Sequence, residues 1–367
     1  MNPSSTSSSE RPGAAGGWRT GVRFAIALTA VLAGAEGLLR VPIVVHALPV
    51  RTHLQQPGLV RRLESVERLQ TARRPLDVLF VGSSIVRCNI NPTEFDRDGS
   101  HAPGREELSF NAGLSGLWPR PVAFYLEHVW LAAARPRIVV QGIRYGELKA
   151  SDRARRESDV LNGPLESLWA APSLVHRVEA DALWRLHLFQ YRGSLTRWLL
   201  AHKRGLPGED ADDDPRVNTD PRGWTPRLPT LDVVRARGLV RSEHPYVGDL
   251  PAESRSAIAA IQQSARMVHQ AGARYILVNV PEHAFRWSAP GGAARYRAYL
   301  HALAAAADAE GFTFIDVTQG NPQAFSVDAE FSDYHHMSPA GALRFTRALA
   351  HELHAIAGKQ PSALASR

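Results

Sequence analysis

Two segments of the chain carry side chains that together would activate a hydroxyl group for nucleophilic attack. Gly82-Ser83-Ser84 directly follows an apolar run, and Asp333 and His336 lie three residues apart in a loop-like segment near the C-terminus. A serine hydroxyl is a poor nucleophile at neutral pH, so it needs an imidazole to take its proton and a carboxylate to orient that imidazole. If the two segments meet, Ser84 attacks, His336 acts as base and then as acid, and Asp333 holds the ring.

Each segment alone is weak evidence for such a site. A Gly-Ser-Ser sequence after a strand is more often a turn and a helix cap, and an isolated Asp-x-x-His is equally unspecific. Asp333, His335 and His336 could also bind a metal ion, but no other His, Asp or Glu motif in the sequence has ligand spacing, and we predict no metal site. The two segments are stronger evidence for a catalytic site together than alone, because one lies at each end of the same predicted fold.

The elements that must position these segments are those of an α/β protein. From residue 73 onward, short β-rich apolar runs alternate with longer helical stretches, which predicts a parallel sheet covered on both faces. The predicted strands are 77–81, 108–110, 137–142, 274–280 and 312–317. The predicted helices are 120–134, 252–271, 293–310 and 339–357, the last capped by Ser338 and ended by Gly358. In such folds the site lies beyond the carboxyl ends of the strands, where both segments fall.

A long insertion, residues 150–250, separates the third predicted strand from the fourth. Its first half has a helical pattern with Trp169, Trp184 and Trp198, and its second half is rich in Gly and Pro and carries the acidic run 209–214. The tryptophans favour the core of an added helical subdomain over a sugar-stacking wall, a lid or a docking surface for a membrane partner. The acidic run lacks the ligand spacing of a calcium loop, so we interpret it as a solvated loop.

The N-terminus carries a candidate membrane segment. Two arginines precede an apolar run over residues 24–35, a pattern typical of a segment whose N-terminus stays in the cytoplasm. The run is short for a span of about 20 residues, but pairing of Glu36 with Arg40 would let the span extend to Val45. We favour an uncleaved anchor over a signal peptide cleaved at the Ala-Gly-Ala sequence 33–35, with a buried helix of a cytosolic protein third. Both favoured interpretations place the rest of the chain outside the cytoplasm.

Composition excludes several classes of protein. The 367 residues include 44% hydrophobic and 22% charged side chains, which excludes a wholly disordered or collagen-like chain. The single cysteine, Cys88, excludes an intrachain disulfide and a cysteine-based zinc site. The formal charge is +7, but only three of the 43 basic residues are lysines, and the arginines are scattered among acidic residues. Because no basic stripe forms, we predict no nucleic-acid partner.

Three motifs together resemble the SGNH (GDSL-type) hydrolase superfamily. Gly82-Ser83-Ser84 is similar to its first block, with Ser83 in place of the usual Asp, NAGLSG at 111–116 to its second, and DYHHMSPAG at 333–341 to its last. The resemblance spans residues 73–357. It implies a flavodoxin-like three-layer αβα sandwich with a five-stranded parallel sheet, in agreement with the five predicted strands.

The same resemblance implies roles for individual residues. Ser84, Asp333 and His336 match the family's catalytic triad, and Gly116 matches its oxyanion-hole glycine, with Gly113 as the less favoured register. The implied mechanism requires no cofactor. A classical α/β-hydrolase is disfavoured, because its elbow needs glycine two residues after the nucleophile, where this chain has Val86.

The family's third block is the point of departure. It supplies an asparagine side chain to the oxyanion hole, and the matching stretch GIRYGE at 142–147 has no asparagine. One lost oxyanion donor costs on the order of a hundred- to a thousandfold in rate. Arg144 or Asn111 could supply the donor, backbone N–H groups of Ser84 and Gly116 could form the hole alone, or the protein could be catalytically weak.

Other charged residues also follow predicted strand ends. Glu282, His283 and Arg87 are candidates to bind an acceptor sugar or an acidic polymer at the rim of the site. An isolated charged rim residue is more often merely solvated, so Arg144 is retained as a site candidate and His283 stays a guess.

The N-terminal helix and the insertion resemble the membrane-anchored branch of the superfamily. That branch takes part in D-alanyl transfer to teichoic acids and in exopolysaccharide O-acetylation, often beside a membrane-bound O-acyltransferase. The resemblance implies a serine O-acyltransferase or esterase of the inner membrane, facing the periplasm or the cell exterior, that transfers or removes acetyl-type groups on a polysaccharide or another envelope glycan. The alternative is a weak or inactive member that binds a glycan or the acyltransferase partner.

The predicted organisation has five parts in chain order. They are a disordered cytoplasmic arm over residues 1–21, a transmembrane signal-anchor over 22–45, a linker over 46–72, the α/β domain over 73–358 with its insertion at 150–250, and a disordered tail over 359–367.

Overall fold

The computed structural model describes part of the chain, and the described residues fall into two compact units. The described residues are 17–41, 44, 62, 65–66, 68–69, 76–99, 107–148, 186, 188, 220–227, 252–288 and 290–358. Residues 1–16, most of the linker, most of the insertion with its three tryptophans and acidic run, and the tail lie outside them. Two compact units divide the chain, Met1–His53 with Asp181–Gly208, and Leu54–Ala180 with Glu209–Arg367.

A five-stranded parallel sheet forms the centre of the larger unit. Its strands are β1 (Val78–Val81), β2 (Ser109–Asn111), β3 (Ile138–Ile143), β4 (Arg274–Asn279) and β5 (Thr313–Asp316). They are ordered β2-β1-β3-β4-β5, and all four neighbouring pairs are parallel. This flavodoxin-like order reverses between β1 and β3, which is where such folds place their ligands. The predicted strand bounds are correct to within one residue at each end.

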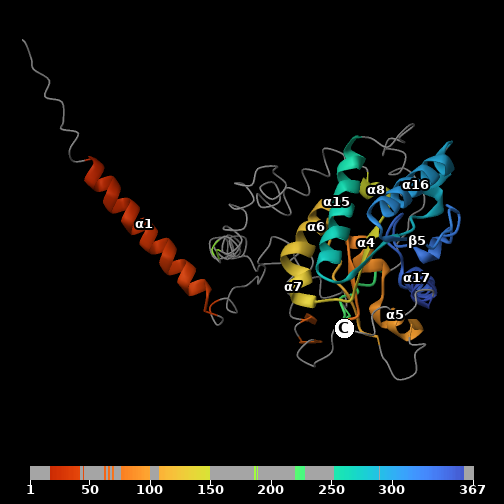
Figure 1. Cartoon of the computed structure of the whole chain (residues 1–367), viewed down its shortest axis with the longest axis horizontal. Helices are drawn as coiled ribbons and strands as arrows, with labels where there is room; N and C mark the ends of the chain where they lie inside the picture. The colour runs from red at the N-terminus through yellow and green to blue at the C-terminus, as the bar shows by residue number, and fades with distance from the viewer. Residues whose placement is uncertain are drawn as a thin grey trace, which may run out of the picture. The chain divides into compact units, whose positions relative to one another are not determined.

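Helices cover both faces of the sheet, which confirms the predicted fold class (Figure 1). One face carries α4 (Ser84–Asn89), α5 (Pro92–Gly99) and α17 (Pro339–Gly358), and the other carries α6 (Pro119–Tyr125), α15 (Ala252–Gln270) and α16 (Gly292–Glu310). On the first face, Phe80, Val140 and Val278 of the sheet pack in one core with Phe345 and Leu349 of α17. Burial on both faces explains why the strands are almost continuously apolar.

One predicted helix is interrupted, and the ends of the others differ from the prediction by one residue. The segment predicted as one helix over 120–134 is α6, a π-helical turn over Leu126–Trp130 and then α7 (Leu131–Ala134), which ends at Arg135 in a left-handed conformation. Hydrophobic spacing does not distinguish a π turn from a regular α-helical turn, so the π turn could not be predicted from the sequence. In α17 the Gly341 N–H lies 3.4 Å from the Ser338 hydroxyl, as predicted for a cap, but Gly358 is the last residue of the helix.

The smaller unit contains the candidate membrane helix, α1 (Gly17–Leu39). Residues Gly21–Leu39 are long and apolar enough to cross a membrane, with a mean hydropathy of 1.7. The predicted pair forms, because Arg40 Nη2 lies 3.0 Å from Glu36 Oε1. The helix begins before residue 22 and ends before the predicted extension to Val45.

The turn between β1 and α4 depends on glycine. Gly82 has φ +148°, and a Cβ there would lie 2.5 Å from Val86 Cγ2 and 2.8 Å from the Gly142 carbonyl oxygen. A Cβ on Gly142 would also lie 2.5 Å from Val86 Cγ2. Gly82 after β1 and Gly142 within β3 therefore let α4 begin directly above both strands, which places Ser84 at the carboxyl edge of the sheet.

Gly82→Ala should destabilise the protein by about 2 kcal/mol or more, because the new Cβ meets both an unfavourable φ and two close contacts. The matched control is Gly272→Ala. Gly272 also has positive φ, +78°, but a Cβ there meets nothing within 4 Å, so the expected cost is only about 1 kcal/mol. Urea unfolding of the detergent-solubilised chain measures both values. Equal losses would show that the packing of α4 on the sheet is not the constraint.

Candidate active site

Ser83 and Ser84 have different surroundings although they are neighbours. Ser83 caps α4, since its hydroxyl accepts the Ile85 N–H at 3.3 Å, and it donates to the buried carboxylate of Glu147. Ser84 is the first residue of the helix, and its hydroxyl lies at the carboxyl end of β1. Because Ser83 is already bonded to Glu147, only Ser84 presents its hydroxyl to the site.

A tight loop between η3 (Asp328–Glu330) and α17 presents the acid and the base. Phe331 and Met337 form an antiparallel bridge, and the Ser332 N–H donates to the His336 carbonyl at 2.8 Å. Within this loop Asp333 Oδ1 accepts the backbone N–H of His336 at 2.8 Å. The loop therefore holds the carboxylate against the backbone of the residue whose ring it must orient.

Asn89 connects α4 to this loop. Its side chain donates to the His335 carbonyl at 3.0 Å and accepts the Met337 N–H at 2.8 Å, so it bonds to the residues on both sides of His336. Asn89 is fully buried. The helix that carries Ser84 thus fixes the position of His336.

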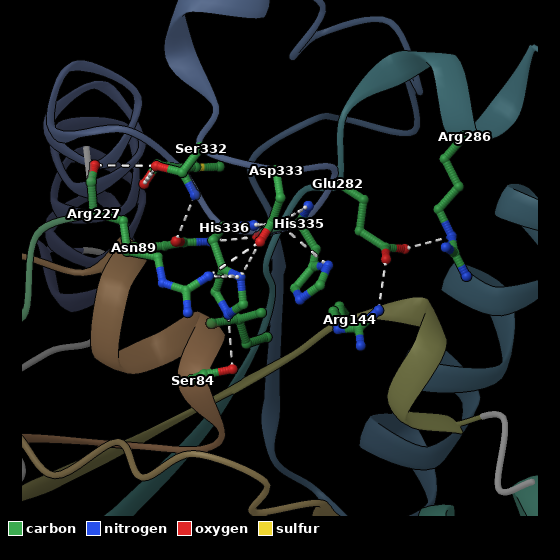
Figure 2. A network of polar contacts seen from close by, with 12 residues as sticks. Ser84, Asn89, Arg144, Arg227, Glu282, Arg286, Ser332, Asp333, His335 and His336 are labelled. Atoms are coloured by element: carbon green, nitrogen blue, oxygen red, sulfur yellow. Dashed lines mark hydrogen bonds and ion pairs between the residues drawn. The ribbon is translucent and has the colours of Figure 1, made fainter. Parts of the chain in front are cut away.

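These contacts bring the three predicted residues into a hydrogen-bonded chain, drawn in Figure 2. Ser84 Oγ lies 2.8 Å from His336 Nε2, and His336 Nδ1 lies 2.7 Å from Asp333 Oδ2. The ionised carboxylate only accepts, so Nδ1 carries the ring hydrogen and Nε2 is left to accept the serine proton. The arrangement has the geometry of a nucleophile, a base and an orienting acid.

The electrostatic environment keeps the acid charged and the base neutral. Burial lowers the pKa of His336, the bond to Asp333 opposes this effect, and the charges of Arg227 and Arg144 add to it. Burial alone would raise the pKa of Asp333, but the hydrogen bond from His336 and the proximity of both histidine rings hold it well below its usual range. At neutral pH, His336 is therefore a free base beside an ionised carboxylate.

The oxyanion candidates have different hydrogen-bond partners. Asn111 donates its amide hydrogens to the carbonyls of Val86 and Ile90, both at 2.7 Å, and its Oδ1 accepts the Gly113 N–H at 2.9 Å. Both the Asn111 amide and the Gly113 N–H are therefore already in use. Within the described residues, no protein acceptor is found for the N–H of Gly116, which has φ +74°.

Arg144 belongs to a buried ionic cluster beside the site. Its Nη1 donates to Glu282 Oε1 at 2.9 Å, and its Nε lies 3.9 Å from Glu147 Oε1. Glu282 also pairs with Arg286, at 3.1 Å. Burial raises the pKa of Glu147 to about 7, against the opposing effects of Arg144 and the Ser83 hydroxyl. Arg144 is thus committed to two carboxylates.

The candidate rim residues do not form an exposed rim. The side chain of Glu282 is 2% exposed, and His283 is also buried, with its Nε2 2.9 Å from Asp328 Oδ1. Arg87 lies half-buried on α4. The histidine and the glutamate are therefore buried and paired with charged neighbours.

The structure adds one residue that no feature of the sequence singles out. Arg227, from the insertion, places its Nη1 3.1 Å from Asp333 Oδ2 and 2.9 Å from His336 Nδ1. It lies more than a hundred residues before the loop in sequence, and no motif surrounds it. Only its position beside the triad distinguishes it from the other arginines.

The same loop also satisfies the spacing of a small metal cluster. Asp333, His335 and His336 each offer a ligand atom within 4.8 Å of the others. Both oxygens of Asp333 and both ring nitrogens of His336 already have hydrogen-bond partners, however. These hydrogen bonds already use the lone pairs that a metal ion would need. The loop therefore fits a proton-transfer chain better than a metal site with three ligands.

Comparison with known proteins gives distant likenesses. A protein-family model matches residues 240–357, less than half of the chain. No curated protein matches.

Among solved structures, a lipase/acylhydrolase from Enterococcus faecalis is 12% identical, with 77% of this chain and 97% of that chain covered and a TM-score of 0.35. A GDSL-like lipase from Bacteroides thetaiotaomicron is 12% identical, with 81% and 99% covered and a TM-score of 0.35. A gut microbial diltiazem-metabolizing enzyme is 10% identical, with 76% and 46% covered and a TM-score of 0.33. Such distant likenesses assign no activity, so the function must be argued from the site.

Proposed function

We propose that this chain is a serine esterase or O-acyltransferase that works through an acyl-enzyme on Ser84. The observation that carries the proposal is the hydrogen-bonded chain Ser84–His336–Asp333, with its 2.8 Å and 2.7 Å contacts. A pure binding protein has no physical need for a neutral imidazole between a hydroxyl and an ionised carboxylate. An acyl-transfer enzyme needs all three.

The first half of the reaction acylates the serine. Ser84 Oγ attacks the carbonyl carbon of an acyl ester while its proton passes to His336 Nε2, and Asp333 stabilises the resulting imidazolium through Nδ1–H. The carbonyl oxygen becomes negatively charged in the tetrahedral intermediate. When the intermediate collapses, the carbon–oxygen bond to the leaving group breaks. His336 gives its proton to the departing oxygen atom, which leaves as a hydroxyl group. Ser84 is left as an ester.

The second half transfers the acyl group to an acceptor. A hydroxyl group or a water molecule loses its proton to His336 Nε2 and attacks the acyl carbon, and the bond to Ser84 Oγ breaks. His336 then returns the proton to Ser84. The same residues thus serve both a transferase and a hydrolase, and the nature of the acceptor decides between them.

The oxyanion hole in this proposal consists of backbone N–H groups. Leu114 donates to the Gly82 carbonyl at 3.0 Å, so the loop that carries Gly116 runs beside the turn that carries Ser84. The N–H groups of Ser84 and Gly116 are the donors that remain, since Asn111 is bonded elsewhere. Arg144 is held by Glu282 through Nη1 and adds its positive charge beside the site. An oxyanion hole with two hydrogen-bond donors instead of three predicts a modest rate of acyl transfer.

The proposed substrate is an acyl ester of a cell-envelope polysaccharide, and the acyl group is of the acetyl type. The support is α1, which is long and apolar enough to cross a membrane, and the arginines before its apolar run, which favour an N-terminus on the cytoplasmic side. With this proposed orientation, Ser84 would lie on the periplasmic side. A membrane-bound O-acyltransferase is the proposed partner, because it would deliver acyl groups to the same side.

The full-length chain in detergent should form an acetyl adduct with an activated acetyl ester. Intact-protein mass spectrometry detects the adduct, and chromatography follows the acetyl group after addition of polysaccharide fragments. Acetylated fragments would identify a transferase, and free acetate alone a hydrolase. If a panel of acyl esters gives neither an adduct nor turnover, the protein is instead the non-catalytic binding alternative.

A further inference from the structure

Part of the insertion is firmly attached to the helix that carries the nucleophile. We call residues 220–227 the strap. The indole Nε1 of Trp224 donates to the Cys88 carbonyl at 2.7 Å, and the Thr225 N–H donates to the Arg87 carbonyl at 3.0 Å. Both carbonyls belong to the C-terminal part of α4, so the strap runs along the helix that Ser84 begins.

The strap also contacts the sheet edge and the loop with the acid and the base. The Asn111 N–H donates to the Arg222 carbonyl at 2.8 Å, and Gly223 approaches Asn111 so closely that a Cβ would lie 2.1 Å from its carbonyl oxygen. At the other end, the Ser332 hydroxyl donates to the Arg227 carbonyl at 3.0 Å. The strap therefore joins both halves of the triad, and it fixes the backbone of Arg227.

The fixed backbone places the Arg227 guanidinium on the triad carboxylate. An ionised carboxylate offers about four lone-pair positions. At Asp333, Oδ1 accepts the N–H groups of His335 and His336 at 2.9 Å and 2.8 Å, and Oδ2 accepts His336 Nδ1–H at 2.7 Å and Arg227 Nη1–H at 3.1 Å. With all four positions filled, the carboxylate cannot rotate away from the ring without losing several bonds.

We propose that Arg227 is a positioning residue, through which the strap of the insertion holds Asp333 in register with His336. The inference rests on the proposed function, since it assigns Arg227 a task within that reaction. Figure 2 shows the guanidinium beside the His336 ring. The Arg227 side chain remains 42% exposed, so its replacement does not leave a buried cavity.

The effect of Arg227 on His336 is electrostatic. The His336 Nδ1 carries the hydrogen that is donated to Asp333, so it cannot accept a hydrogen bond. The Arg227 Nη1, 2.9 Å away, is itself a donor, and the two nitrogens therefore form no hydrogen bond with each other. A positive charge at this distance disfavours the imidazolium. The groups that face His336 are Asp333 and His335 of its own loop, Ser84 of α4, Arg144 after β3 and Arg227 of the strap. Arg227 and Arg144 lower the pKa of His336, and Asp333 raises it.

Arg227→Gln should therefore change two observables of the full-length enzyme in detergent. The acid limb of the pH profile for activated-ester turnover should move to higher pH by about 0.5 to 1 unit, because His336 gains a proton more easily. The value of kcat at the plateau should fall about 10-fold, because Asp333 loses one of its four bonds, while KM stays within about twofold. A purely structural role would not shift the limb.

Two further variants identify the cause. Arg227→Lys keeps the positive charge, so its acid limb should stay near that of the wild type even where kcat falls. Arg222→Gln removes another arginine of the strap, whose guanidinium pairs with Asp96, and it should leave the limb unmoved. An equal shift in Arg222→Gln would mean that the strap backbone, and not Arg227, sets the basicity of His336.

A second readout separates failure of this inference from failure of the proposed function. NMR of histidines labelled at the ring carbon, with His336 assigned from His336→Gln, follows ionisation without turnover. A midpoint that rises in Arg227→Gln supports the inference even if no ester is turned over. An unchanged midpoint and an unchanged acid limb, in an enzyme whose turnover still depends on Ser84, would overturn the inference and leave the proposed function intact.

Discussion

Ser84→Ala should reduce turnover of an activated acetyl ester by about 10⁴-fold or more and abolish the acetyl adduct. The hydroxyl is the atom that forms the acyl-enzyme, and it lies 2.8 Å from the base. Alanine leaves the backbone N–H of residue 84 and the fold of α4 in place, so any residual rate reports binding and the oxyanion donors alone. Stopped assays of ester turnover and intact-protein mass spectrometry measure the two effects separately.

Ser83→Ala is the matched control for this loss. Ser83 is adjacent in sequence, but its hydroxyl is bonded to Glu147 and to the start of α4, not to His336. Its removal should cost about 1 kcal/mol of stability as a lost cap, while the acetyl adduct still forms. If turnover survives in Ser84→Ala and disappears in Ser83→Ala, then Ser83 and not Ser84 is the nucleophile.

The fold could be predicted because its determinants are local. Strands buried on both faces read as short apolar runs, and the runs over 77–81 and 137–142 mark β1 and β3 to within one residue. The short helices α4 and α5 have too few residues for a periodic pattern, and their positions depend on packing against α17. The π turn at Leu126–Trp130 was missed for a related reason, since it changes the backbone and not the hydrophobic spacing.

The meeting of Ser84 with Asp333 and His336 could also be predicted, because one topological rule brings them together. In a parallel sheet the carboxyl ends of all strands lie at one edge, so the segments that follow β1 and β5 lie at the same edge however far apart they are in sequence, and the loop after β5 only has to run back past β4 and β3. The short spacing of Asp333 and His336 then lets one loop supply both acid and base. Type, spacing and position relative to strands were sufficient here.

Residues whose role depends on a partner could not be predicted in this way. Asn111 was a reasonable oxyanion candidate by motif, yet its amide bonds to two carbonyls of the helix region that begins at Ser84. Glu282 follows a strand end like a rim residue, but Arg144 and Arg286 bury its charge. Arg227 is one of many scattered arginines. In each case the decisive information is which group lies opposite the side chain, and sequence position does not contain it.

His336→Ala should be as damaging as Ser84→Ala, with a loss of about 10⁴-fold or more, because an unassisted serine hydroxyl keeps its proton at neutral pH. In the wild type, activity should fall as pH drops through the pKa of His336, which burial and the nearby arginines hold below the usual histidine value. His335→Ala is the matched control. It removes the neighbouring ring but keeps the backbone N–H bonded to Asp333, so it should lose far less.

The decisive experiment on the triad is the combination of the two losses. Because Ser84 and His336 act as one unit, the double variant Ser84→Ala/His336→Ala should be no slower than either single variant, although independent contributions would multiply. Added imidazole should partly restore His336→Ala, since a free base can fill the space beside Ser84 Oγ, and it should do nothing for Ser84→Ala. Multiplicative losses, or rescue of the serine variant, would mean that His336 contributes to activity by some route other than taking the proton of Ser84.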